Sequence, residues 1–180
     1  MGYLSKKYPL STEKISPRSV VYIVDDPLLL FWYKFIHPNT SSIIYQGKEN
    51  TFSALIRPKL EAYFGYCFER ICKAGLPYIY NKENVISPFE IGSFWDKHMQ
   101  IDVVGIRQDR WIDLCECKWG PNIALKKTAV ELMKKCENYP NRKNFTIRPR
   151  IFVRQIRKNS VLPDHVSIHT LEDLYTMHNI

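Results

Sequence analysis

The segment QIDVVGIRQDRWIDLCECKW, residues 100–119, decides the fold of this chain. It holds two largely apolar runs, residues 100–107 and 111–119, separated by a polar triplet at 108–110. Each run has the length of a strand and is rich in the β-branched and aromatic residues that favour strands. The segment therefore predicts an antiparallel hairpin within a sheet.

The register of this hairpin determines which side chains meet. With the turn at 108–110, Asp102 lies opposite Glu116, and Gln100 lies opposite Lys118. Because side chains alternate along a strand, two groups on opposite faces are expected. One face carries Gln100, Asp102, Val104, Leu114, Glu116 and Lys118, and the other carries Ile101, Val103, Cys115 and Cys117. Two carboxylates and a lysine thus converge on one face of two otherwise apolar strands.

This cluster has a definite chemistry. Carboxylates with Cβ atoms about 5 Å apart repel each other when both are ionised, so a divalent cation is a natural occupant. Oxygen ligands favour Mg²⁺ or Mn²⁺, and the backbone carbonyl of Cys117 could supply one more ligand. Such a metal polarises a phosphoryl oxygen, while Lys118 positions water or stabilises developing negative charge, which is machinery for phosphodiester hydrolysis. The alternative is a cross-strand salt-bridge cluster on a solvated face, and spacing alone leaves both open.

Patterns on either side of the hairpin predict an α/β or α+β protein built on a mixed sheet flanked by helices. We expect an N-terminal hairpin, a helix with Asp26 as N-cap and Pro27 in its first turn, and then a polar linker. A second helix is expected to end at Gly75, before Pro77. The expected elements are a hairpin at 3–11 and 19–24, helices at 27–36 and 53–75, strands at 85–95, 100–107 and 111–119, a helix at 125–139, strands at 150–156 and 166–169, and a helix opened by Thr170 with Asp173.

The composition restricts the class of protein. The chain has 180 residues, of which 45% are hydrophobic and 24% charged, and this excludes a disordered, collagenous or coiled-coil protein. The longest apolar run, residues 27–36, is too short for a membrane span, and the N-terminus lacks signal-peptide features, so a cytoplasmic protein is expected. Its five cysteines form no CxxC pair, which favours free buried thiols over zinc or disulfides.

The positive charge is unevenly distributed. The chain has a formal net charge of +8, and residues 119–160 hold eleven lysines and arginines but only two acids. A concentrated basic segment with interleaved aromatic residues favours a polyanion such as DNA as partner. A solvated helix face followed by a basic loop is the alternative.

Three motifs resemble those of the PD-(D/E)XK nuclease superfamily. They are Gly65–Glu69 (GYCFE) in a helix, Gln100–Val104 (QIDVV) in a strand and Glu116–Trp119 (ECKW) in the next strand. Ile91–Trp95 (IGSFW) and Asp26–Trp32 (DPLLLFW) extend the resemblance to the C-terminal portion of archaeal-type DEXX-box ATPases. The resemblance implies a restriction-endonuclease-like core at residues 53–180, preceded at 1–52 by part of a winged helix, a helix and a linker.

The resemblance also implies roles for individual residues. Asp102 and Glu116, with the Cys117 carbonyl, would be the ligands of Mg²⁺ or Mn²⁺, and Lys118 would activate water or stabilise charge. Glu69 would hold a metal-bound water, with Glu61 as the fallback and a solvated glutamate as the alternative. Residues expected to contact nucleic acid are Lys126, Lys127, Arg150 and Arg154, although a solvated face explains the two lysines equally well.

The expected function is that of a Mg²⁺-dependent DNA endonuclease-like domain. The alternative is a catalytically inactive module that binds DNA or docks on a DEXX-box ATPase. An ATPase domain or a second copy of the chain could bind through residues 27–36, and no membrane partner is expected. Because the sequence contains no GxxxxGK[ST] phosphate-binding loop, ATP hydrolysis by this chain is not expected.

Overall fold

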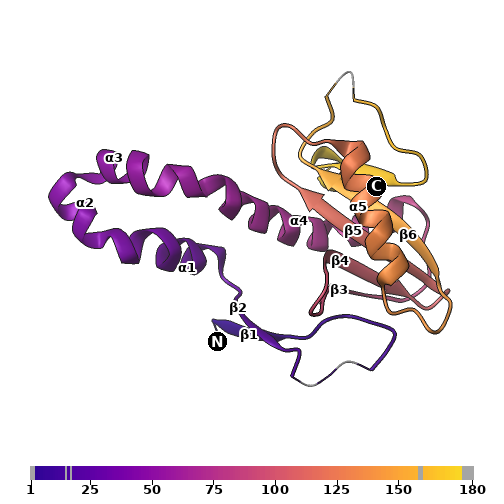
Figure 1. Ribbon diagram of the computed structural model, residues 1–180. Coiled ribbons are helices and arrows are strands. Elements are labelled where there is room, and N and C mark those ends of the chain that lie inside the picture. Colours follow the sequence, from indigo (N-terminus) through magenta and orange to yellow (C-terminus); the bar gives the residue numbers. More distant parts are fainter. Residues whose placement is uncertain (1–2, 15, 17, 158–159, 176–180) are drawn as a thin grey trace.

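The computed structural model describes residues 3–14, 16, 18–157 and 160–175, and it shows an α/β core with a projecting helical arm (Figure 1). The strands of the described residues are β1 (Leu4–Lys7), β2 (Val21–Val24), β3 (Phe89–Trp95), β4 (Gln100–Arg107), β5 (Trp111–Lys118), β6 (Thr146–Val153) and β7 (Ser167–Thr170). The α-helices are α1 (Pro27–Phe31), α2 (Thr40–Gln46), α3 (Lys48–Thr51), α4 (Leu60–Lys82) and α5 (Leu125–Asn138). Short π- or 3₁₀-helical turns are η1 (Trp32–Ile36), η2 (His37–Asn39), η3 (Phe52–Ile56), η4 (Arg57–Lys59) and η5 (Glu172–Leu174).

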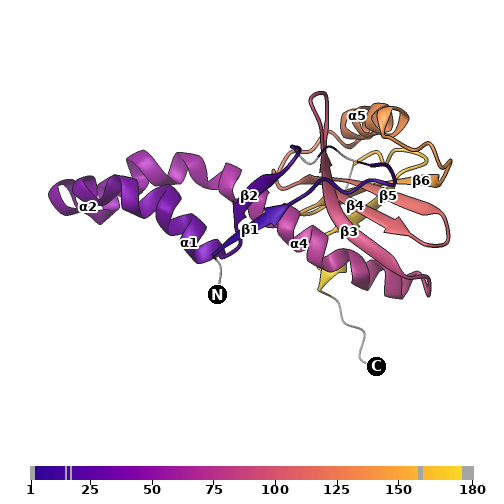
Figure 2. The same cartoon turned by 90° about the horizontal axis from the view of Figure 1, so that it is seen from below.

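The main sheet has the strand order β3-β4-β5-β6-β7. The pairs β3–β4 and β4–β5 are antiparallel, whereas the pairs β5–β6 and β6–β7 are parallel. Helix α5 covers one face of the sheet and α4 covers the other (Figure 2). The predicted fold class, a mixed sheet flanked by helices, is confirmed.

The paired part of the central hairpin has the predicted register, with Val103 opposite Cys115 and Gly105 opposite Asp113, but the ladder ends before the predicted pairs Asp102–Glu116 and Gln100–Lys118. The two faces bury separate apolar clusters. Val104 and Leu114 pack with α5, while Val103 and Cys115 pack with α4. The alternation read from the sequence therefore assigns these four side chains to the correct faces.

Ile101 is an exception, because the prediction places it on the face of Val103 and the structure groups it with Val104 and the α5 side. The reason is an irregularity in the β3–β4 pairing. Gly92 pairs with Val104, but Phe94 pairs with Ile101, so two residues of β4 lie opposite the single Ser93. Such a β-bulge resets the alternation of side chains along the strand, and the sequence pattern does not reveal it.

The segment predicted as a polar linker, residues 37–53, is helical instead. The chain runs through η1, η2 and α2, turns at Gly47 with φ +84°, and returns through α3, η3 and η4 into α4. Pro38 and Pro58 lack the N–H that an α-helix needs, and each follows a π-helical turn closed by an i→i−5 hydrogen bond. The helices therefore continue past both prolines, and the domain boundary expected after residue 52 falls within helical turns.

The outgoing and returning helical segments of this arm pack on each other around a small aromatic core. Phe35, Ile56 and Tyr63 are buried at its centre, and the Tyr63 hydroxyl donates a hydrogen bond to the Pro27 carbonyl (2.9 Å). The arm projects away from the sheet (Figure 1). Among the described residues, no helix combines the length and apolar character needed to cross a membrane.

Helix α4 does not end at Gly75, as predicted, but continues through Pro77 to Lys82. Leu76, Ile79 and Tyr80 lie beyond the expected end and are buried against the sheet, so tertiary packing outweighs the low helix propensity of proline. Gly75 serves close packing here, because a Cβ at this position would lie 2.6 Å from a methyl group of Leu174.

The N-terminal hairpin pairs as predicted, with Leu4 opposite Val24. The chain that follows β1 then covers the outer edge of β3, where the Leu10 N–H donates to the Ser93 carbonyl (2.7 Å). Near the C-terminus, Asp173 accepts hydrogen bonds from the Thr170 N–H and hydroxyl, as the predicted capping pair requires. The helix that they open is the single turn η5 within the described residues, and positions 176–180 lie outside them.

Candidate functional site

Asp102 and Glu116 lie where the β4–β5 ladder ends. The last paired residues are Val103 and Cys115. One position further on, the Asp102 carboxylate (Oδ2) accepts a hydrogen bond from the Cys117 N–H (2.8 Å). The side chain of Asp102 thus takes the place of a backbone partner. The two strands separate at this point, with a carboxylate on each.

Glu116 is only 8% exposed and contacts two lysines. The Lys118 ammonium lies 2.7 Å from its Oε1 atom, and the ammonium of Lys135 on α5 lies 2.6 Å from its Oε2 atom. The sequence analysis missed Lys135. Its position between the buried residues Leu132 and Cys136 on α5 is the signal that could have placed it toward the sheet.

The carboxyl groups of the cluster influence one another. Burial, followed by the charge of Glu116, raises the pKa of Asp102 to about 6. Burial, followed by the charge of Asp102, raises the pKa of Glu69 to about 7. Glu69 therefore approaches from α4, as predicted, whereas the fallback Glu61 is solvent-exposed. We call Glu69, Asp102, Glu116, Lys118 and Lys135 the carboxylate–lysine cluster.

The donor set suits Mg²⁺, although the metal requires a rearrangement. No three His, Cys, Asp or Glu side chains of the described residues are grouped closely enough to hold a metal ion together. Mg²⁺ needs only one or two carboxylates, because it retains several water ligands, and Asp102 and Glu116 could supply those two. The lysines now paired with Glu116 would have to move aside, and the salt-bridge alternative describes the cluster as it stands.

The residues predicted to contact DNA differ in their exposure. Arg150 has no exposed surface, and its guanidinium is bound to Asp113 and Glu83, so its predicted contact with DNA is wrong. Arg154 is exposed and lies over the Trp119 ring, 4.8 Å from its centroid. Lys126 and Lys127 are exposed at the start of α5. Of the four residues predicted to contact DNA, these three remain available to a polyanion.

Acidic residues from other parts of the chain neutralise much of the basic segment. Besides Arg150, three more of its cations form ion pairs outside the segment: Lys135 with Glu116, Arg142 with Glu13 and Arg148 with Glu83. The charge count along the sequence therefore overstates the positive surface of this region.

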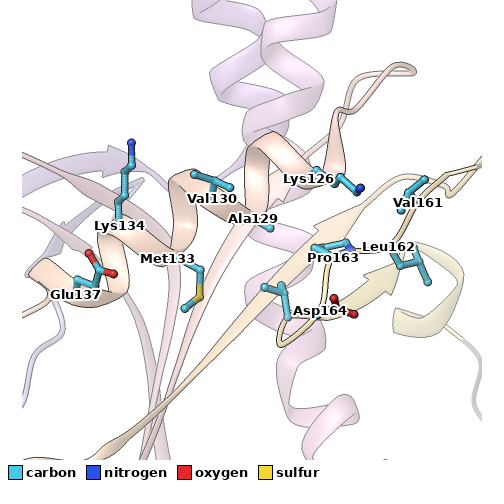
Figure 3. Close-up of a pocket in the computed structure, with 11 residues that line it drawn as sticks. Lys126, Ala129, Val130, Met133, Lys134, Glu137, Val161, Leu162, Pro163 and Asp164 are labelled. Carbon is cyan, nitrogen blue, oxygen red and sulfur yellow. The ribbon is translucent and has the colours of Figure 1, made fainter.

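A cleft of about 710 Å³ lies between α5 and the loop that precedes β7. Val130 and Met133 line it from the helix, Leu162 and Pro163 line it from the loop, and Lys126 stands at one end (Figure 3). No member of the carboxylate–lysine cluster lines this cleft. Lys126 is thus associated with an apolar cleft and not with the carboxylates.

We expect Asp102→Asn to stabilise the protein by about 1–2 kcal/mol at pH 8. Because the pKa of Asp102 is raised from 3.8 to about 6 in the folded protein, the protein loses stability as the pH rises through this range. Asparagine does not ionise and removes this loss. The amide oxygen can still accept the Cys117 N–H. Urea unfolding at pH 8 and pH 4 measures the effect, which should disappear at the lower pH. Equal destabilisation at both pH values would contradict it.

Fold and site together define an α/β protein with a mixed five-stranded sheet and a half-buried cluster of carboxylates and lysines where two strands separate. Residues 32–132 match the DUF234 family, described as archaeal and bacterial proteins of unknown function, and the chain belongs to this family. The chain is similar to the uncharacterized protein MJECL04 of Methanocaldococcus jannaschii, with 28% identity over 124 residues. The match covers 65% of this chain and 26% of the relative, so the chain spans about a quarter of that protein's length. No solved structure matches the chain.

Proposed function

We propose that this chain is a Mg²⁺-dependent nuclease-like domain of the PD-(D/E)XK type that hydrolyses phosphodiester bonds in DNA. The observation that supports the proposal is the convergence of Asp102, Glu116 and Glu69 from two strands and a helix around Lys118. The raised pKa values of Asp102 and Glu69 mark a place where negative charge is costly and a bound cation is favoured.

Each residue has a role that follows from its position. Asp102 and Glu116 would hold a divalent cation, which would supply Lewis acidity to a phosphoryl group. Lys118, which pairs with Glu116, would stabilise the negative charge that develops on the phosphate. Glu69 would accept a proton from water as the water oxygen bonds to phosphorus and the leaving oxygen departs and takes a proton from solvent.

Cleavage assays test this proposal. Supercoiled, linear and branched DNA are incubated with the protein in Mg²⁺ or Mn²⁺. Asp102→Asn, Lys118→Ala and Glu69→Gln should each reduce the cleavage rate at least about 100-fold. Glu61→Gln is the matched control on the same helix, because Glu61 is exposed and should leave the rate unchanged. Cleavage that persists in Asp102→Asn or Lys118→Ala would overturn the assignment.

The projecting arm favours a second candidate function, that of a docking module for a DEXX-box ATPase. Leu28, Trp32 and Tyr33 on one side of the arm, and Ile44 and Tyr45 near its tip, are all at least half exposed. An apolar surface of this kind is typical of a protein interface. The resemblance to C-terminal portions of DEXX-box ATPases suggests the partner.

Trp32 fluorescence provides the test of docking. Titration with a purified archaeal DEXX-box ATPase core should change the tryptophan emission of this chain without any added metal, and Trp32→Phe should remove that change. Leu28→Asp and Tyr45→Asp should abolish the change, whereas Tyr78→Asp, an exposed tyrosine outside the arm, should not. An unchanged spectrum on titration of the unmodified chain would reject docking through the arm.

A further inference from the structure

Lys73 and Ser93 form a hydrogen-bonded chain that ends at the backbone of Asp102. The Lys73 ammonium on α4 donates to the Ser93 hydroxyl (2.5 Å), and the Ser93 hydroxyl donates to the Asp102 carbonyl oxygen (2.7 Å). Ser93 is the residue of β3 that faces the bulge in β4. Side chains therefore connect helix α4 to the bulge in the β3–β4 pairing.

The bulge determines where the Asp102 carboxylate lies. Because it resets the alternation, Ile101 and Val104 both pack on the α5 side, and the residues between them leave the regular pleat. The Asp102 carboxylate then reaches the Cys117 N–H across the end of the ladder. A hydroxyl that holds the Asp102 carbonyl thus fixes the backbone from which this carboxylate projects.

Lys73 occupies an electrostatically unusual position. Burial lowers the pKa of Lys73, and the positive charges of Lys7 and Arg70 lower it further. The charge of Glu69, one helical turn earlier, raises it. Burying an ammonium group near two other cations costs free energy unless the group is hydrogen-bonded. The hydrogen bond to Ser93 is a structural role for this lysine that the sequence analysis did not identify.

We propose that Lys73 and Ser93 are positioning residues of the candidate site, which hold the bulge so that the Asp102 carboxylate faces the end of β5. The inference rests on the proposed function for the use made of that carboxylate. The positioning itself is a property of the fold and can be measured without metal or DNA. Removal of a group that hydrogen-bonds to a metal-ligating residue and orients it commonly weakens metal binding by about 10- to 100-fold.

Amide hydrogen exchange at Cys117 is the decisive measurement, because its N–H is protected by the Asp102 carboxylate. At pH 7.5, Ser93→Ala and Lys73→Met should accelerate exchange at Cys117 at least about 10-fold, whereas exchange at Cys115, inside the ladder, should not change. Ser93→Thr retains the hydroxyl and should retain protection. Lys82→Met is the matched control, since Lys82 is exposed at the end of the same helix.

Calorimetric titration with Mn²⁺ separates the two proposals. Ser93→Ala and Lys73→Met should weaken Mn²⁺ binding about 10-fold or more relative to the unmodified chain and to Lys82→Met. If Cys117 exchanges at the same rate in Ser93→Ala as in the unmodified chain, the positioning role is overturned. If the unmodified chain binds no Mn²⁺, the proposed function fails, and the exchange rates at Cys117 still decide the role of Lys73 and Ser93.

Discussion

Arg150→Met is expected to lower the free energy of unfolding by about 3–5 kcal/mol, because it leaves the buried Asp113 carboxylate without its cation, while the partly exposed Glu83 keeps only Arg148. The Arg150 Nε atom donates to Asp113 (2.6 Å), and the Nη1 and Nη2 atoms donate to the two oxygens of Glu83 (2.7 and 2.6 Å). Asp113 is fully buried and also accepts the Tyr80 hydroxyl. Methionine fills much of the same volume, so the expected loss arises from the uncompensated charge.

Urea unfolding at pH 7.5 measures this effect, and two further variants locate its cause. Arg150→Lys keeps the positive charge but cannot form the two-pronged contact with Glu83, so we expect an intermediate loss of stability. Arg154→Met changes an exposed arginine four residues away and should cost less than about 1 kcal/mol. Equal losses in Arg150→Met and Arg154→Met would show that the buried network contributes nothing specific.

The sequence predicted the hairpin and its register because both depend on local information. Two strands joined by a short turn can pair in few ways, and the alternation of Val103, Val104, Leu114 and Cys115 selects the one that buries them. The same register brings Asp102 to the end of β5. The direction of its carboxylate could not be predicted, because it depends on the bulge opposite Ser93 in the neighbouring strand β3.

The role of Arg150 could not be predicted, since its partners are remote in sequence. Asp113 is 37 residues away and Glu83 is 67 residues away, and neither spacing marks a pair. A charge count treats Arg150 as one cation in a basic segment, whereas the fold neutralises it inside the protein. A count of charges along the sequence therefore does not predict a basic surface where ion pairs with remote residues neutralise those charges.

The same limit applies to the lysines of the site. Lys73 and Lys135 lie on the two helices that cover opposite faces of the sheet, and only the packing of α4 and α5 brings them to Asp102 and Glu116. The helical arm was missed for a related reason. The polar, turn-forming residues of 37–53 favour a linker, but the π-helical turns η1 and η3 and the packing of Phe35 against Tyr63 keep the segment helical.

Stability should fall by about 3 kcal/mol between pH 6.5 and pH 4 through His169 alone. Burial, followed by the charge of Arg150, lowers the pKa of His169 from 6.5 to about 4. The Nε2 atom of its imidazole lies 2.9 Å from the Arg150 Nη1 atom, so the ring serves as an acceptor and must be neutral. As the pH falls below 6.5, His169 binds a proton in the unfolded chain but not in the folded protein. This difference in proton binding favours unfolding.

His169→Gln tests this account, because glutamine keeps an acceptor for Arg150 and does not titrate. Between pH 7.5 and pH 4.5, the unmodified protein should lose about 2–3 kcal/mol more stability than His169→Gln. His98→Gln, which changes an exposed imidazole, should show the full loss of the unmodified protein. The Arg150 guanidinium also lowers the pKa of Glu83, so the stability that Glu83 contributes is lost only below its ordinary pKa of 4.5. Asp102 and Glu69 also titrate between pH 7.5 and pH 4.5, but they do so in all three proteins, so the difference between the stability curves isolates His169. Parallel curves for all three proteins would show that this imidazole is not held neutral by Arg150.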